Sequence, residues 1–170
     1  GPLLDLSGRI IGVNSQIISA SGSSAGIGFA ISAATVQRVV PQLITQGHYA
    51  HPWLGVQLLG LTPERTAAFR KAGVDITAEQ GMLVVEVVAD GPADKAGIHG
   101  GDQIQRIGNV EIPLGGDIIT ALNNQSITDM QQLTVYLETH TQVGDTIDAK
   151  ILRNGEERTI RITLEERPQQ

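Results

Sequence analysis

Residues 91–98 read Gly-Pro-Ala-Asp-Lys-Ala-Gly-Ile, and residues 115–123 read Gly-Gly-Asp-Ile-Ile-Thr-Ala-Leu-Asn. The first stretch predicts one helical turn over 92–96, because proline is favoured at the first helical position and glycine just past the end. The second predicts a short apolar strand over 118–122. The nearly continuous apolar run over 82–88 predicts a buried strand. Short strands with few helices are typical of an α+β domain.

Further elements are expected on both sides of these stretches. Trp53 opens a predicted strand over 53–58, and the sequence Thr-x-x-Gln at 128–131 has the form of a capping box. It predicts a helix that ends near Gly144. The Asn-Gly pair at 154–155 separates two alternating apolar segments, which is the strongest short signal for a hairpin.

The first 47 residues predict a few strands and one helix. Strands are expected over residues 3–6, 9–14 and 27–31. A helix is expected over 33–46, because Ser32 can cap its start and Gly47 can stop it. Residues 48–52 read as a linker, and the chain is therefore predicted to have two parts, residues 1–47 and 53–167.

Composition excludes several classes of function. The 170 residues include 12 Lys and Arg against 18 Asp and Glu, a net charge of −6. This balance argues against a nucleic-acid surface and against binding to an anionic membrane surface. The absence of cysteine excludes disulfides, thiolate metal sites and cysteine nucleophiles. No stretch approaches the roughly 20 apolar residues of a membrane span.

Two short motifs suggest chemistry but favour simpler interpretations. Residues 22–26, Gly-Ser-Ser-Ala-Gly, fit the form of a nucleophile elbow, which needs a helix directly after the serine. A strand is predicted there instead, so an α/β-hydrolase that uses Ser24 is the weaker alternative. His48 and His51 are three residues apart but precede Pro52 in the predicted linker, so we expect solvated histidines and no metal pair. The sequence carries no phosphate-loop or dinucleotide fingerprint, and no cofactor is expected.

The order of these motifs resembles one known family. Residues 91–98 and 115–123, followed by the capped helix, closely resemble the PDZ domains of HtrA/Deg serine proteases. The opening Gly-Pro-Leu-Leu-Asp at 1–5 resembles the residues after the catalytic serine in their motif G-N-S-G-G-P-L, and residues 9–14 and 26–31 resemble the last strands of their protease domain. The resemblance implies a mainly β fold with α+β character. It would contain the C-terminal strands and closing helix of a trypsin-like β-barrel, followed by a PDZ-like domain.

The resemblance implies the C-terminal part of an HtrA/Deg-type serine endopeptidase that acts in protein quality control. Such proteases are periplasmic, cell-envelope or extracellular proteins, and they form homotrimers through their protease domains. If Gly1 is the second glycine of the motif, the catalytic serine lies just before this chain, which we then expect to be a fragment. None of the four histidines matches the catalytic one, so no catalytic residue is assigned and the chain alone is expected to be inactive.

The same resemblance implies two sets of site residues. In the first part, a wall of the protease substrate pocket is expected at Ile17, Gly26, Ile27 and Gly28. The glycines would let a substrate backbone approach closely, and the isoleucines would favour small apolar side chains. Ordinary strand residues are the alternative interpretation of this set.

In the second part, Trp53-Leu54-Gly55-Val56 occupies the place of the PDZ carboxylate-binding loop. Consecutive backbone amides around a glycine can hold a carboxylate, and the strand that comes next, with Leu58, can pair with an extended peptide. The capped helix would form the other wall through Met130, Leu133, Thr134 and Leu137. The expected partners are the C-termini of peptides or unfolded proteins and the remaining protease domain. The alternatives are core packing for the helix residues and a packing anchor for Trp53.

A rival function comes from another class. A stand-alone PDZ adaptor would bind peptides without any protease, and its first 47 residues would only be a docking segment. A G-N-S-G motif encoded upstream of Gly1 would favour the protease.

Overall fold

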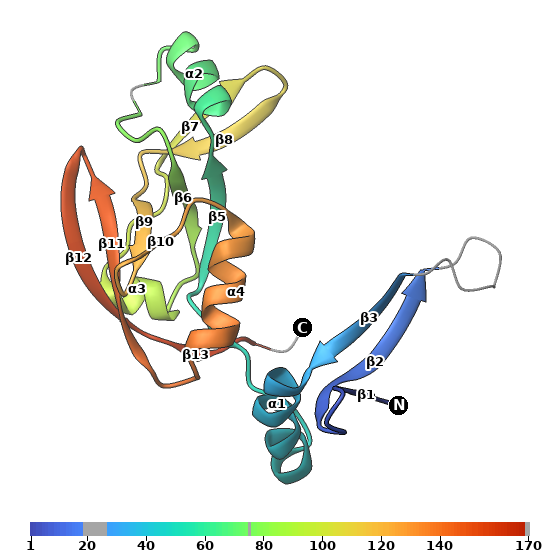
Figure 1. The fold of residues 1–170 in the computed structure, drawn as a ribbon. Coiled ribbons are helices and arrows are strands. Elements are labelled where there is room, and N and C mark those ends of the chain that lie inside the picture. Colours follow the sequence, from blue (N-terminus) through green and yellow to red (C-terminus); the bar gives the residue numbers. More distant parts are fainter. Residues whose placement is uncertain (19–26, 75, 169–170) are drawn as a thin grey trace. The chain divides into compact units, whose positions relative to one another are not determined.

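The computed structural model describes residues 1–18, 27–74 and 76–168. The chain forms two compact units, Gly1–Ala50 and His51–Gln170 (Figure 1). The expected mainly β fold with a few helices is confirmed.

The first unit contains a three-stranded antiparallel sheet in the order β1-β2-β3. Its strands are β1 (Pro2–Leu4), β2 (Ile10–Ile18) and β3 (Ile27–Ser32). Helix α1 (Ala33–Gln46) begins directly after β3, because the Ser32 side chain accepts a hydrogen bond from the Thr35 amide. Gly47 ends the helix with a φ of 77°, as its position in the sequence predicted.

The first unit exposes most of its apolar side chains. Among its described residues Gly12 alone is buried, and α1 buries none of its side chains fully. The exposed set comprises Leu3, Leu4, Leu6, Ile10, Ile11, Val13, Ile17, Ile27, Phe29, Ile31, Val40, Leu43 and Ile44. The described part of this unit therefore has no buried apolar core of its own.

The second unit is built on a larger antiparallel sheet. Its strands have the order β12-β11-β9-β6-β5, and β10 pairs with β9. They are β5 (Val56–Leu61), β6 (Gly81–Val87), β9 (Ile118–Leu122), β10 (Gln125–Ser126), β11 (Thr146–Arg153) and β12 (Glu156–Thr163). Two further pairs are β4 (Pro52–Trp53) with β13 (Glu165–Glu166), and β7 (Gln103–Ile107) with β8 (Val110–Leu114).

Three helices complete this unit: α2 (Pro63–Lys71), α3 (Pro92–Ala96) and α4 (Met130–His140). Strand β6, which lies between β9 and β5 in the sheet, contributes to the core, where Met82 and Val84 are fully buried. They pack with Ile119 of β9 and with Leu133 of α4 in the main apolar cluster. A second cluster lies around Phe69 of α2.

Several predicted boundaries were wrong. The expected strand over 3–6 ends at Leu4, because residues 5–8 form a turn in which Gly8 N donates to Asp5 O at 3.0 Å. The expected strand over 53–58 is interrupted, because Gly55 adopts a φ of 77° between β4 and β5. The N-cap of α4 is Asp129, one residue after the start of the predicted capping box, and its side chain accepts a hydrogen bond from the Gln132 amide at 2.8 Å. The helix ends at His140, before the predicted Gly144, because Thr141 is extended.

Candidate functional site

A groove of about 400 Å³ lies between strand β5 and helix α4, which run side by side in Figure 1. The structure brings all nine residues of the predicted peptide site into its lining: Trp53, Leu54, Gly55, Val56, Leu58, Met130, Leu133, Thr134 and Leu137. Loop, strand and helix thus contribute to one concave surface.

Strand β5 leaves one edge of the sheet open beside this groove. It is the last strand in the sheet order, with β6 as its only partner among the described residues. Val88 N donates to Gly55 O at 2.8 Å, so the next pair, Val56 and Val87, is a non-hydrogen-bonded pair of the ladder. The N–H and C=O of Val56 therefore point away from β6, toward the open edge.

The directions of two backbone amides in the loop before β5 follow from the hydrogen bonds of the carbonyls that precede them. Leu54 O accepts from Ala93 N at 2.9 Å, and Gly55 O accepts from Val88 N. The described chain contains no cis peptide, and C=O and N–H point in opposite directions across a trans peptide. The amides of Gly55 and Val56 therefore point away from α3 and β6. Two adjacent backbone amides that point away from the rest of the fold can bind an anion such as a carboxylate.

Glycine is required at position 55 for two reasons. Its φ of 77° lies in the left-handed region, where other residues are strained. A Cβ atom there would also lie 3.1 Å from Pro92 Cδ. The aliphatic-Gly-aliphatic pattern of the sequence therefore corresponds to a real backbone constraint.

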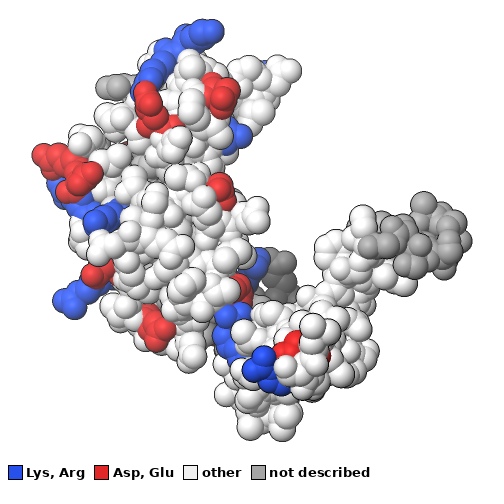
Figure 2. Space-filling view, in the orientation of Figure 1, with Lys and Arg blue, Asp and Glu red and all other residues white. Residues whose placement is uncertain are grey.

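The floor of the groove is apolar and its rim is open. Leu133 and Leu137 of α4 are buried, whereas Met130 and Thr134 are exposed on the same face of the helix. Strand β5 carries no charged residue, and α4 carries one carboxylate, that of Glu138. Figure 2 shows a largely uncharged surface over the middle of this unit, with charged side chains toward its periphery. The groove suits an apolar side chain.

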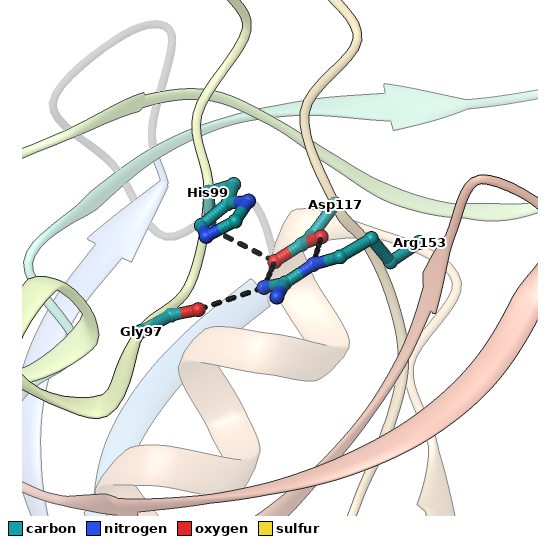
Figure 3. Close-up of polar contacts among 4 residues, drawn as sticks. All are labelled: Gly97, His99, Asp117 and Arg153. Carbon is teal, nitrogen blue, oxygen red and sulfur yellow. Dashed lines mark hydrogen bonds and ion pairs between the residues drawn. The ribbon is translucent and has the colours of Figure 1, made fainter.

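A buried ion pair holds α3, and with it the loop (Figure 3). Asp117 accepts from Arg153 Nε and Nη2, both at 2.7 Å, and from His99 N at 2.8 Å. The same Nη2 donates to Gly97 O, at the end of α3, at 2.7 Å. The hydrogen bond with Asp117 raises the pKa of Arg153 above its usual value, so the guanidinium stays charged. Since α3 supplies the Ala93 amide that binds Leu54 O, this pair helps to position the loop.

The loop end of the groove carries charges that the sequence did not lead us to expect. His51 Nδ1 lies 2.7 Å from Glu138 Oε1, and both residues line the groove together with Arg167. Glu138 could have been found, because it is four residues after Thr134 and so lies on the same helix face. Arg167 could not, because the pairing of β13 with β4 brings it there.

The predicted substrate-pocket residues of the first unit are only partly brought together. Ile17 and Gly28 are paired across β2 and β3 and line a shallow hollow of about 490 Å³. Ile27 does not line this hollow. Gly26 lies outside the described residues, and so does Ser24 of the nucleophile-elbow motif.

Metal ligands and membrane-spanning helices are both absent from the described part of the chain. Residues 1–18, 27–74 and 76–168 contain no group of three or more His, Asp or Glu side chains that could hold a metal ion. None of the helices described is long and apolar enough to cross a membrane.

Both parts of the chain have known relatives. The PDZ domain family model matches residues 52–164. The chain is 36% identical over 168 residues to a "Probable periplasmic serine endoprotease DegP-like" of Marinomonas sp., a match that covers 99% of this chain but 31% of that relative. It is also 36% identical over 168 residues to "Protease Do-like 1, chloroplastic" of Arabidopsis thaliana, a match that covers 99% of this chain and 35% of the relative. The chain thus spans about a third of the length of these relatives.

Solved structures of HtrA-type proteases are also similar to the whole of this chain. "HtrA-type protease AlgW with decapeptide" is similar with a TM-score of 0.69 and 32% identity, over 100% of this chain and 46% of that one. "HtrA-type protease AlgW with tripeptide" is similar with a TM-score of 0.66 and 31% identity, over 100% of this chain and 50% of that one.

Proposed function

This chain belongs to the PDZ domain family and corresponds to a C-terminal portion of the HtrA/Deg serine proteases, and from this premise we propose a function for its groove. The groove binds the free C-terminus of an extended peptide. The peptide adds a strand to the open edge of β5. Its terminal carboxylate is held by the amides of Gly55 and Val56. Its last side chain enters the apolar floor beside Leu133 and Leu137. The observation that carries this proposal is the outward direction of the Val56 and Gly55 amides at an unpaired sheet edge.

The two edges of the sheet support this assignment, because they differ in charge. Strand β12, at the far edge, reads Glu-Glu-Arg-Thr-Ile-Arg-Ile-Thr, and its four charges discourage pairing with another strand. Strand β5 reads Val-Gln-Leu-Leu-Gly-Leu and has no such protection. An open, uncharged edge beside an apolar groove is what strand addition requires.

For the whole protein we propose an HtrA/Deg-type serine endopeptidase of protein quality control in the periplasm or cell envelope, acting as a homotrimer. Residues 1–47 are then the end of its trypsin-like protease domain, with Ile17, Gly26, Ile27 and Gly28 at the substrate pocket. Residues 48–52 are a linker and 53–167 the PDZ domain. The exposed apolar side chains of the first unit support this over a stand-alone adaptor, because such a surface needs a protein partner to cover it.

The test compares one peptide in two forms with the 170-residue chain. A peptide with an apolar last residue is prepared as the free acid and as the C-terminal amide, and binding is measured through the fluorescence of Trp53, the only tryptophan. Amidation removes the charge that the loop amides bind. A charge-assisted hydrogen bond contributes about 1.5–3 kcal/mol, so the Kd should rise at least about tenfold. Equal affinity for the two forms would contradict the proposal that the loop amides bind the terminal carboxylate of the peptide.

A further inference from the structure

Strands β7 and β8 form a hairpin that is separate from the main sheet (Figure 1). On one face of the hairpin, Ile107, Ile112 and Leu114 belong to the apolar cluster around Phe69. Ile104 is outside this cluster and is 74% exposed, more than any other large apolar side chain described in the second unit. The hairpin thus has one face fixed in the core and one face open to solvent.

Strand β7 has a free edge, because β8 is its only partner among the described residues. Ile107 pairs with Val110 next to the two-residue turn, and Ile104 pairs with Pro113. In such a hairpin the pair next to the turn is hydrogen-bonded, and hydrogen-bonded and non-hydrogen-bonded pairs alternate from there. Ile104 is therefore in a non-hydrogen-bonded pair, and its N–H and C=O point to the free edge. Pro113 fits the same pair, because its nitrogen has no hydrogen to donate.

The charges near Ile104 have opposite signs on its two sides. Residues 102–106 read Asp-Gln-Ile-Gln-Arg. Asp102 and Arg106 are each two residues from Ile104, and both are exposed. Glu111 is opposite Arg106 on β8, but within the described ranges neither Asp102 nor Arg106 has an ion-pair partner. The stretch is therefore symmetric about Ile104 in its uncharged residues and opposite in its charges.

We propose that the free edge of β7 pairs with the same edge of a second copy of this chain, around a two-fold axis at Ile104. In an antiparallel pair centred there, the two Ile104 side chains are opposite each other. Asp102 of each copy is then opposite Arg106 of the other. Gln103 of each copy is opposite Gln105 of the other. A two-fold contact must be self-complementary, and this one has an apolar centre with an ion pair on each side.

The two charges decide which partner this edge accepts. Charged residues on an edge strand normally discourage pairing with other strands. A strand of unrelated sequence leaves Asp102 and Arg106 without opposite charges, whereas a second copy of the chain supplies both. The inference does not depend on peptide binding at β5, because β5 and β7 belong to different sheets.

A single introduced thiol reports this contact, because the chain contains no cysteine. In the proposed pair the two Cα atoms of residue 104 are about 5.5 Å apart, a distance that a disulfide can span. Ile104→Cys in the 170-residue chain should therefore give a disulfide-linked dimer under mild oxidation. Val110→Cys is the control, because Val110 is 59% exposed on the same hairpin but far along the chain from the axis. On a non-reducing gel, I104C dimers should form at least about tenfold faster than V110C dimers, since only the I104C thiols are held together.

Reversed charges test whether the contact is reciprocal. In the I104C background, Arg106→Glu puts a carboxylate opposite Asp102 at both ends of the contact. It should slow dimer formation at least about fivefold, the scale of two exposed ion pairs lost. Asp102→Lys should have the same effect, because the lysine is opposite Arg106. A mixture of the D102K and R106E variants should regain the I104C rate, because every facing pair again joins opposite charges. Mass spectrometry should identify the products as mixed dimers.

Recovery in the mixture would also exclude a folding defect as the cause of the slower rates. Three results would overturn the inference: I104C dimers that form no faster than V110C dimers, rates that charge reversal leaves unchanged, or a mixture that reacts no faster than either variant alone. Each would mean that a second copy of the chain does not cover the edge of β7.

Discussion

Arg153 donates two hydrogen bonds to the buried carboxylate of Asp117, one from Nε and one from Nη2. Each nitrogen binds a different carboxylate oxygen, and both distances are 2.7 Å. The two residues come from β11 and from the turn before β9, and Asp117 is 1% exposed. This pair joins the sheet to α3, whose Ala93 amide donates to Leu54 O in the loop before β5.

We therefore predict that Arg153→Met strongly destabilises the second unit. The substitution keeps much of the side-chain volume but leaves a buried carboxylate without its cation. Breaking a buried pair in this way costs about 3–5 kcal/mol, and we expect about 3 because Arg153 itself reaches solvent. Urea unfolding measures the loss. Arg158→Met is the control, because the Arg158–Glu156 pair is exposed and should contribute less than about 1 kcal/mol. Similar losses for both variants would show that the Asp117 pair has no special role.

A charge placed on the helix wall of the groove should block binding. Thr134 is exposed and lines the groove, so Thr134→Arg puts a long cation where the apolar part of the ligand lies. We predict at least about a tenfold rise in the Kd for an apolar-ended peptide, since one unfavourable polar burial costs about 1–3 kcal/mol. The measurement is a Trp53 fluorescence titration.

Gln131→Arg is the control for that variant. Gln131 is on the same helix but does not line the groove, and it is exposed. Its substitution adds the same side chain and should leave the Kd unchanged. Equal weakening by both variants would place the ligand elsewhere or point to a general effect of charge on α4.

The two units should differ in resistance to proteolysis. Segments with few buried apolar contacts open with a low free energy, and the described part of the first unit buries almost none of its apolar side chains. We predict that trypsin cuts first at Arg9 or Arg38, and that cleavage after Arg38 leaves a resistant fragment that begins at Val39. Mass spectrometry of a time course identifies the first cut. Initial cleavage at Lys95 or Arg106, with the first unit intact, would contradict this order.

Helix limits were predicted well where one residue decides them. Ser32 and Gly47 bound α1 as expected, because no neighbour competes for either role. At the start of α4, Thr128 and Asp129 both can cap. The structure uses Asp129, while Gln132 Oε1 accepts from the Thr128 amide at 3.1 Å. Local pattern alone does not choose between two adjacent capping residues.

The candidate site was predictable where its residues belong to one contiguous motif. Trp53 to Val56 and the α4 residues were expected because the loop and the capped helix resemble those of PDZ domains. Arg167 depends on the pairing of β13 with β4, which no local signal reveals. The break at Gly55 was also missed, because a strand pattern does not indicate a positive φ. Contacts between distant segments decide these features.

The most direct test of carboxylate binding is the response of two backbone amides to the ligand. A ¹⁵N–¹H NMR titration with the free-acid peptide should shift the Gly55 and Val56 amides downfield, because they become donors to a carboxylate. The amidated peptide, at a concentration that gives equal occupancy, should shift the α4 residues but leave these two amides near their free positions. Identical shifts of Gly55 and Val56 with both peptides, or no shift with the free acid, would contradict a carboxylate held by this loop.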